Sequence, residues 1–328
     1  METTQFRFTR VVLALSAAAF GFAASHAAAQ AYPAKPVQIV LPYSAGGSTD
    51  VIARAVAKRL GDAWGKNVIV DNRPGASGMI GAEIVAKADP DGYTLLSTTS
   101  SYPATAAVRK KLPFDAAKAL IPVATFAHAP MLLAVHPSLP VKSVKELIAF
   151  AKKNPGKLNY SSSGTGGNNH FSGALFASAA GIQLTHVPYK GIAPAVLAVG
   201  SGEVEMVISS SSALLPMINA HKVRILGVSS LKPSPMFPGV PAIAQNGAPG
   251  YHYELWWGLF APAGLPAERI AFINAAVNKL LATADMKKFL DTQGTEEWAQ
   301  TPAQIADLLP KEIARYKKAM ELAGIQPQ

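Results

Sequence analysis

The chain has 328 residues, no cysteine, 15% charged residues and a formal net charge of +10. Without cysteine it can contain no disulfide framework, thiol nucleophile or thiolate metal site. A positive charge can indicate a nucleic-acid or membrane partner, but Lys and Arg are scattered, and their densest runs, at 109–111 and 152–153, lack interleaved aromatic residues. We therefore expect no nucleic-acid partner and interpret the charge as a general attraction for small anions.

The first 29 residues have the pattern of a secretory signal peptide. Arg7 and Arg10 precede the apolar stretch 11–24, and the alanines at 27–29 offer a small-residue cleavage site. The alternative is a transmembrane anchor, but the stretch is close to the minimum length for spanning a bilayer and polar residues interrupt it. We expect cleavage near Ala29 and export of the remaining chain to the periplasm as a soluble monomer.

The first half of the exported chain is predicted to alternate strands with helices, because β-branched runs alternate with apolar residues at helical spacing. In chain order the elements are a strand at 37–41, a glycine-rich loop at 44–49, a helix at 51–60, a buried strand at 68–70, a turn at 72–75, a helix at 80–88 and a buried strand at 93–96. Strands that alternate with helices predict a parallel sheet.

The second half repeats this pattern and predicts a second sheet. Ser143 and Glu146 have the spacing of a capping box, and a second glycine-rich loop at 163–169 follows a strand. The expected strands lie at 131–135, 158–162, 185–189, 204–208 and 223–228, with helices from 144, 193 and 212.

The tail is predicted to be helical. Pro266 stands where a first-turn proline belongs, and Thr301 and Gln304 repeat the capping pattern. Pro310 should kink or split the final helix, which we expect to end near residue 323.

Two domains are predicted after the signal peptide (1–29). Because the tail helices are expected to return to the first sheet, the first domain combines residues 30–127 with 230–328, and the second spans 128–229. Crossings near 125–130 and 227–231 would join them.

The two glycine-rich loops predict an anion clamp. Each follows a strand and precedes a helix, so its backbone can approach a ligand closely while the free N–H groups and the positive helix end favour a carboxylate or phosphate. Either loop alone could be an ordinary strand-to-helix turn. Two of them in one chain suggest that both hold one small anion.

Six separated segments resemble, in the expected order, the substrate-binding receptors of tripartite tricarboxylate transporters, also called the Bug family. These segments are 32–36, 41–50, 71–76, 90–95, 186–191 and 257–262. The resemblance covers almost the whole exported chain. It implies a type II periplasmic-binding-protein fold, in which two α/β domains joined by two hinge crossings close on a ligand in the cleft between them. It also implies small carboxylate ligands, held mainly by backbone amides, hydroxyls and water, and delivery to membrane transporter subunits.

The resemblance also implies which residues bind the ligand. In the first jaw, Tyr43 would pack on the ligand body and the backbone amides of the loop would hold a carboxylate. That loop contributes Ala45, Gly46, Gly47, Ser48 and Thr49. The opposite jaw would comprise Ser162, Gly164, Thr165, Gly166, Asn168, Asn169 and His170.

Further candidates lie where open α/β sheets present ligands, at the carboxyl ends of strands. They are Thr99 and Ser100 in the first domain and Tyr189, Ser209 and Ser210 in the second. The serine run can also be read as a polar loop. Family members commonly carry an acidic residue where this chain has Ile-Ser-Ser-Ser at 208–211, and the loss of that carboxylate leaves the identity of the ligand open. Dicarboxylates, tricarboxylates, aromatic acids and acidic amino acids all stay open.

Catalysis is not expected. Ser229 and Lys232 have a serine–lysine spacing without the Lys-Thr-Gly partner, the histidines are scattered, and no phosphate-binding loop is present. We therefore predict a receptor without metal or cofactor. Two alternatives remain, a ligand-sensing receptor that contacts a sensor protein and, less favoured, a secreted hydrolase.

Overall fold

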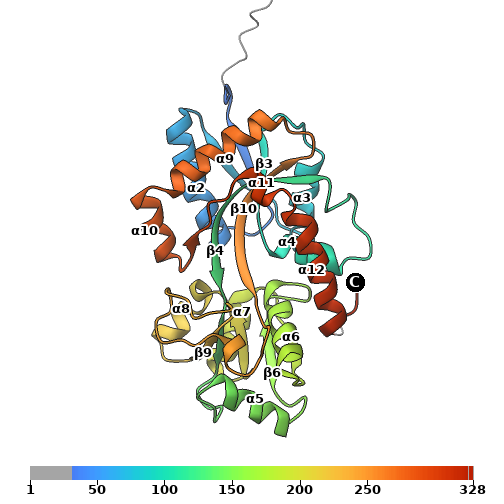
Figure 1. Cartoon of the computed structure of the whole chain (residues 1–328), viewed down its shortest axis with the longest axis vertical. Helices are drawn as coiled ribbons and strands as arrows, with labels where there is room; N and C mark the ends of the chain where they lie inside the picture. Colours follow the sequence, from blue (N-terminus) through green and yellow to red (C-terminus); the bar gives the residue numbers. More distant parts are fainter. Residues whose placement is uncertain (1–31, 324, 328) are drawn as a thin grey trace, which may run out of the picture.

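The structure is a computed structural model that describes residues 32–323 and 325–327, so the predicted signal peptide lies outside the described residues. Two lobes, each built on its own β-sheet, lie end to end and are connected by long strands (Figure 1). The part of the chain that is described contains no helix with the length and apolarity needed to cross a membrane.

The first lobe is built on a mixed sheet with the strand order β11-β4-β10-β3-β1-β2. Its strands are β1 (Val37–Leu41), β2 (Val68–Asn72), β3 (Thr94–Thr99), β4 (Leu120–Pro130), β10 (Glu254–Pro262) and β11 (Glu296–Glu297). β1 pairs in parallel with β2 and β3, whereas β10 is antiparallel to β3 and β4. The predicted parallel sheet is therefore only partly correct, because β10 and β11 run antiparallel to the strands they pair with.

The strand β2 was expected to be buried, and this expectation is wrong. It lies at the edge of the sheet, where Ile69 is 53% exposed. An edge strand pairs with a neighbouring strand on one side only, so part of it stays exposed. The apolar run Val-Ile-Val can occur in an edge strand or in a central strand, so it does not distinguish the two.

The helices of the first lobe pack their apolar stripes on this sheet. They are α2 (Ser48–Trp64), the 3₁₀ turn η2 (Ala76–Gly78), α3 (Met79–Ala86), α4 (Ser101–Val108), α9 (Ala267–Leu281), α10 (Ala284–Thr292), α11 (Pro302–Ile305) and α12 (Leu308–Ala323). In α2 the buried residues Ile52, Val56 and Leu60 recur at intervals of four, as the sequence pattern predicts.

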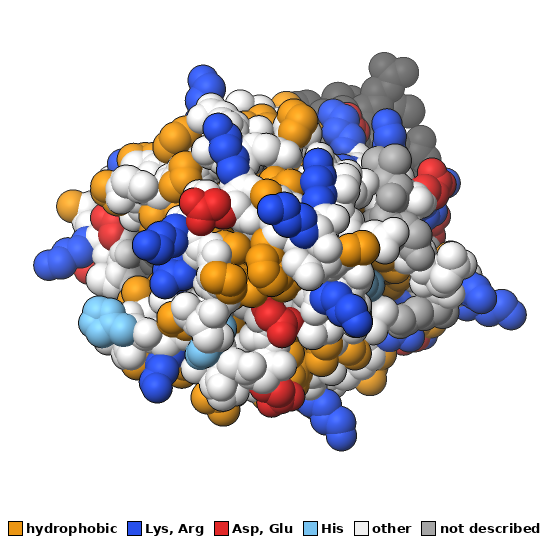
Figure 2. Space-filling model, turned by 90° about the horizontal axis from the view of Figure 1, so that it is seen from below, with side chains coloured by type: hydrophobic (Ala, Val, Ile, Leu, Met, Phe, Trp, Pro, Cys, Tyr) orange, Lys and Arg blue, Asp and Glu red, His pale blue; other side chains and the backbone are white. Residues whose placement is uncertain are grey.

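The second lobe has a five-stranded mixed sheet in the order β7-β6-β8-β5-β9. Its strands are β5 (Leu132–Val135), β6 (Asn159–Ser162), β7 (Thr185–Pro188), β8 (Met206–Ser209) and β9 (Arg224–Val228). Its helices are α5 (Val144–Lys153), α6 (Asn168–Ala180), α7 (Ile192–Ser201) and α8 (Ser211–Asn219), with a 3₁₀ turn η3 (Ile243–Gln245). Viewed from below, this end of the molecule carries Lys and Arg side chains spread over its surface without a single basic patch (Figure 2).

The helix boundaries follow the predicted caps closely. Thr301 and Gln304 form a complete capping box at α11, and Ser143 Oγ accepts a hydrogen bond from Glu146 N at 3.2 Å at α5. The carboxylate of Glu146 accepts from Lys142 N instead of Ser143 N. The final helix is split as predicted, between α11 and α12, and Pro310 falls in the first turn of α12, where a missing N–H costs nothing.

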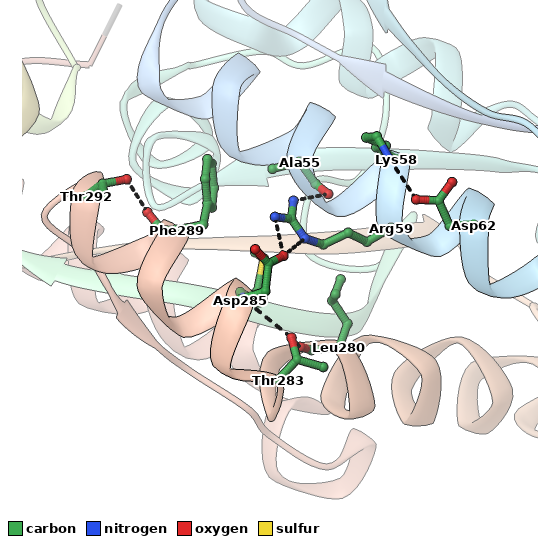
Figure 3. Close-up of polar contacts among 10 residues, drawn as sticks. Ala55, Lys58, Arg59, Asp62, Leu280, Thr283, Asp285, Phe289 and Thr292 are labelled. Atoms are coloured by element: carbon green, nitrogen blue, oxygen red, sulfur yellow. Dashed lines mark hydrogen bonds and ion pairs between the residues drawn. The ribbon is translucent and has the colours of Figure 1, made fainter.

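Helix α10 is attached to α2 by one arginine (Figure 3). Arg59 donates to Asp285 Oδ2 through Nε (2.9 Å) and Nη2 (2.6 Å), and its Nη1 donates to Ala55 O (3.1 Å). The Arg59 guanidinium also lies 5.4 Å from the ring centroid of Phe289. This contact joins the C-terminal helices to the N-terminal part of the same lobe, as the tail was predicted to do.

The chain passes between the lobes through β4 into β5 and returns into β10. Residues 230–253, which the predicted division assigns to the first domain, contact the second lobe. Ala242 bridges to Val228, and Tyr251 donates to or accepts from Ser172 on α6 at 2.7 Å. The residue at which the domains divide stays a prediction.

Candidate functional site

A cavity of about 430 Å³ opens between the two lobes, where the carboxyl ends of β1, β3 and β6 meet. Both lobes supply its walls. Its lining residues are Pro42, Tyr43, Ser44, Gly47, Ser48, Thr49, Asp50, Pro74, Gly75, Ser77, Gly78, Thr99, Ser101, Thr105, Met131, Ser163, Gly164, Thr165, Gly167, Asn168, Asn169, Ile192, Ser209, Ser210, Leu255 and Trp257.

Two helices begin at this cavity in nearly the same way. Gly47 precedes α2 with φ −78° and ψ 167°, and Gly167 precedes α6 with φ −82° and ψ 169°. In neither case does a side chain of the described residues cap the helix. The first-turn N–H groups of both helices are therefore available to an anion, and the helix dipoles add to the attraction.

Asp50 lines the cavity but is already engaged. Its carboxylate accepts hydrogen bonds from Arg54 Nε (3.0 Å), Asn72 Nδ2 (3.0 Å) and Gly46 N (3.1 Å). Burial raises the pKa of Asp50, but these hydrogen bonds outweigh burial and hold its pKa below the ordinary value. Asp50 therefore stabilises the first glycine loop, and its charge is neutralised by Arg54.

Hydroxyl groups dominate the first-lobe wall. Tyr43 OH lies 2.8 Å from Thr98 Oγ1 and 2.6 Å from Ser101 Oγ, and Thr99 Oγ1 lies 2.8 Å from the same Ser101 oxygen. Each hydroxyl can donate and accept, so the cluster can reorient its hydrogens toward a ligand oxygen.

The apolar part of the wall comes from β10 and its neighbours. Trp257 lines the cavity and donates from Nε1 to Thr49 Oγ1 at 3.1 Å, whereas Trp256 faces away and donates to Glu312 at 3.2 Å. Adjacent residues on a strand face opposite sides, which explains why Trp257 lines the cavity and Trp256 does not.

The two asparagines that begin α6 are held differently. Asn169 is 6% exposed, donates to Ile208 O at 2.8 Å and accepts from Ser163 Oγ at 3.0 Å, so both ends of its amide are used. Asn168 is half-buried at the cavity wall, and its Oδ1 accepts from Tyr253 OH at 2.8 Å.

Ser209 presents a buried hydroxyl to the cavity. Its side chain is 0% exposed, and its Oγ has no hydrogen-bond partner among the described residues. A buried hydroxyl without a partner is unfavourable, so a bound ligand or water is expected to supply one.

Seven predicted site residues do not line the cavity, and most of these have hydrogen-bond partners elsewhere in the protein. They are Ala45, Gly46, Ser100, Ser162, Gly166, His170 and Tyr189. Gly166 N donates to His170 Nδ1 at 3.0 Å, Ser162 Oγ lies 2.6 Å from His186 Nε2, and Tyr189 OH donates to Glu203 at 2.7 Å. Ser162 and His170 thus lie behind the second glycine loop and support it. Their direct contact with a ligand stays a prediction.

Sequence reasoning missed the wall formed by 74–78. Pro74, Gly75, Ser77 and Gly78 line the cavity. The backbone of Ser77 has a φ of +56°, a value that residues other than glycine rarely adopt. The closely spaced glycines in this segment were the available signal, but 72–75 was interpreted as a turn and 71–76 as part of the family resemblance, with no ligand-binding role. Leu255, Met131 and Ile192 were also missed, because apolar residues next to strands do not differ from core residues in the sequence.

Charge is scarce in the lining. Asp50 is the one Asp, Glu, Lys, Arg or His among the described lining residues. The described residues also contain no cluster of three or more His, Asp or Glu side chains suited to a metal ion. The site is therefore built from backbone amides, hydroxyls, carboxamides and apolar side chains.

Comparison with known proteins agrees with this arrangement. Residues 52–325 match the model of the tripartite tricarboxylate transporter family receptor. Protein BugT of Bordetella pertussis is 33% identical, over 95% of this chain and 96% of its own.

Solved structures are similar over the same span. Rpa4515 of R. palustris, solved with adipate, is 36% identical with a TM-score of 0.82, over 90% of this chain and all of its own (100%). MatC of Rhodopseudomonas palustris, solved with malate, is 29% identical with a TM-score of 0.77, over 88% of this chain and 99% of its own. These matches confirm the predicted type II periplasmic-binding-protein fold. The chain belongs to the tripartite tricarboxylate transporter family of receptors, the family that includes the Bug proteins.

Proposed function

We propose that the chain is an exported receptor that binds a small organic carboxylate between its lobes and delivers it to a membrane transporter of the tripartite tricarboxylate type. The observation that carries the proposal is the pair of glycine-preceded helix ends, at Gly47 and Gly167, that open on one cavity from opposite lobes. Two positive helix ends at a cavity with no Lys, Arg or His among its described lining residues suit an anion that is held by backbone amides.

The arrangement favours a ligand with two acidic ends. One helix end belongs to each lobe, so a dicarboxylate can engage α2 with one carboxylate and α6 with the other. The apolar surfaces of Trp257 and Leu255 suit the carbon chain between them. The structures of relatives with adipate and malate support this ligand class.

Ligand binding would be coupled to the relative position of the lobes. A ligand that contacts both lobes stabilises the conformation in which they approach each other, and a transporter or a sensor protein can recognise that conformation. The sensing receptor stays the alternative to transport, because both roles use the same cavity.

A secreted hydrolase is the second alternative. Such an enzyme would need a titratable pair in the cavity, and the carboxylate of Asp50 is already bound by Arg54 and Asn72. Consumption of the bound acid is the measurement that distinguishes an enzyme from a receptor.

The proposal is tested by thermal unfolding of the mature protein after unfolding and refolding to remove bound ligand. We expect adipate or malate to raise the melting temperature in a saturable way, because a ligand that binds only the folded state adds about 2.7 kcal/mol at a hundred times its Kd. Citrate, benzoate and glutamate test the other acid classes, and adipamide is the uncharged control. An equal shift with adipamide, or no shift with any acid, would contradict carboxylate recognition.

A further inference from the structure

The side chain of Asn168 has a defined orientation at the cavity. Its carbonyl oxygen Oδ1 accepts hydrogen bonds from Tyr253 OH at 2.8 Å and from Ser100 Oγ at 3.4 Å. A carbonyl oxygen has two lone pairs, so both are engaged. The amide nitrogen Nδ2 has no acceptor among the described residues, and Asn168 lines the cavity. Both of its N–H groups are therefore available to a ligand.

Tyr253 is itself oriented by the C-terminal helix. Tyr316 OH on α12 donates to Tyr253 OH at 3.0 Å, and Arg315 Nη2 donates to Tyr316 OH at 3.4 Å. An arginine can only donate, so the Tyr316 hydroxyl donates its own hydrogen bond to Tyr253 OH, and the Tyr253 hydroxyl donates to Asn168 Oδ1. We call these three residues, Arg315, Tyr316 and Tyr253, the tyrosine relay.

The two tyrosines of the relay are enclosed, whereas the side chain of Arg315 is 40% exposed. Tyr253 and Tyr316 are each 0% exposed, and their rings lie 6.0 Å apart. Burial raises the pKa of both tyrosines, so their hydroxyls keep their protons. Without water to offer alternative partners, a hydroxyl of the relay that lost its acceptor would be left unpaired.

The relay also connects parts of the chain that are far apart in sequence. Tyr316 lies on α12, Tyr253 directly precedes β10 where the chain returns to the first lobe, and Asn168 is the first residue of α6 in the second lobe. Phe171 on α6 packs against Tyr316, with ring centroids 5.0 Å apart. The second glycine loop is therefore oriented by α12, a helix that begins in the other lobe (Figure 1).

We infer that Tyr253 and Tyr316, outside the cavity, are positioning residues for ligand binding: they fix the Asn168 amide with its N–H groups toward an acceptor on the ligand. The inference rests on the proposed carboxylate-binding function. It assigns to Asn168 the role of a donor to a ligand oxygen, while Asn169, whose amide nitrogen and oxygen each have a partner within the protein, serves the structure of the loop.

A double-mutant cycle tests the inference, with adipate as the probe and calorimetric titration as the measurement. Tyr253→Phe should weaken binding by about tenfold, the order expected when one hydrogen bond to a binding group is lost. In the Asn168→Ala background the same substitution should change the Kd by less than about twofold. Tyr316→Phe should act in the same direction with a smaller effect. An equal loss in both backgrounds, or no loss at all, would overturn the inference.

Tyr251→Phe is the matched control. Tyr251 is also buried, and its hydroxyl also contacts α6, at Ser172 Oγ (2.7 Å), but among the described residues no hydrogen bond joins this hydroxyl to the relay. This variant should lower the melting temperature while leaving the Kd for adipate unchanged. A loss of affinity as large as that of Tyr253→Phe would show a general effect on α6 and would count against the relay.

A second readout separates this inference from the proposed function. In the ligand-free protein, the side-chain amide of Asn168 gives a pair of NMR signals that Asn168→Ala identifies by their loss. Tyr253→Phe should shift these signals, and Tyr251→Phe should leave them in place. Unchanged signals in Tyr253→Phe would overturn the positioning role even if adipate binds. Conversely, shifted signals without binding of any acid by the native protein would support the relay and contradict the proposed function.

Discussion

Asn168 and Asn169 show how two adjacent, identical side chains acquire different roles. The carbonyl oxygen of Ile208 and the hydroxyl of Ser163 use both ends of the Asn169 amide, and Tyr253 orients the Asn168 amide. The sequence predicted donors at both positions because loop composition indicates polar groups. It could not separate them, since their partners lie 39 and 85 residues away.

At the same scale, His170 and His186 are predicted to make stability depend on pH. Their rings are stacked with centroids 3.9 Å apart, and Tyr160 is the other titratable group that faces them, with its ring centroid 6.4 Å from His170. Burial lowers the pKa of each histidine to about 4, and for His186 the neighbouring His170 adds to the effect. The adjacent cavity between α6 and residues 325–327 has no charged side chain among its described lining residues.

The direction in which stability changes with pH follows from the linkage between proton binding and folding. The unfolded chain takes up protons at these histidines below its ordinary pKa of 6.5, whereas the folded chain takes them up only near 4. Stability should therefore be fully present above pH 6.5 and fall between pH 6.5 and pH 4. In the folded protein His170 is protonated only near pH 4, and protonation of its Nδ1 removes the acceptor for Gly166 N, so carboxylate binding should weaken only near pH 4.

This pH dependence is checked by melting temperatures of the native protein and His170→Asn between about pH 8 and pH 4. Asparagine places an acceptor near the position of Nδ1 but does not titrate, so the variant should lose less stability on acidification. His128, whose pKa is raised first of all by its hydrogen bond with Glu254, changes stability with the opposite sign but is the same in both proteins. Parallel curves for the two proteins would contradict the assignment.

At the scale of elements, the accuracy of prediction follows the range of the interactions. β1 has its predicted bounds, and α2, α5 and the split before α12 follow their local caps and spacing. The pairing of β10 with β4 was not predicted, because residues 254–262 and 120–130 are joined by hydrogen bonds that no local pattern encodes. The second sheet is mixed because β5 is antiparallel to β8 and β9, and this pairing was not predicted either. Strand order and direction depend on contacts that the alternation of strands and helices does not specify.

The contact between the second glycine loop and α4 provides a prediction at this scale. Gly166 has φ +79°, and a Cβ at this position would lie 2.8 Å from Val108 Cγ2 at the end of α4 in the first lobe. Gly166→Ala should therefore force the lobes apart and weaken carboxylate binding. We expect the Kd to rise by about tenfold or more, which corresponds to a loss of about 1.4 kcal/mol of binding free energy. Titration calorimetry measures this effect.

The control for backbone strain is Gly46→Ala. Gly46 has a similar φ of +85°, but a Cβ there would meet nothing within 4 Å. It should cost about 1 kcal/mol of stability through the left-handed backbone and affect binding much less. Val108→Ala, combined with Gly166→Ala, should recover part of the lost affinity by making room. If Gly46→Ala and Gly166→Ala weaken binding equally, the contact between the lobes is not the cause.

For the whole molecule, the sequence predicted two α/β lobes with a cleft between them, and the structure has this form (Figure 1). The two glycine loops come together at that cleft because each follows a strand whose carboxyl end faces the other lobe. The relay through α12 was beyond prediction, because Tyr253 and Tyr316 are buried aromatic residues whose sequence pattern is that of an ordinary core. The loops that approach the ligand were thus predictable, and the buried groups that orient them were not.

A calorimetric titration of the ligand-free mature protein with adipate, followed by chemical recovery of the acid, tests carboxylate recognition and the absence of turnover together. We predict saturable binding of one acid per chain, no binding of adipamide at the same concentrations, and full recovery of unchanged adipate. Binding of adipamide as tight as that of adipate would contradict this prediction, because the glycine-preceded helix ends would then not be recognising charge. Consumption of the acid would equally contradict it, because the cavity would then belong to an enzyme.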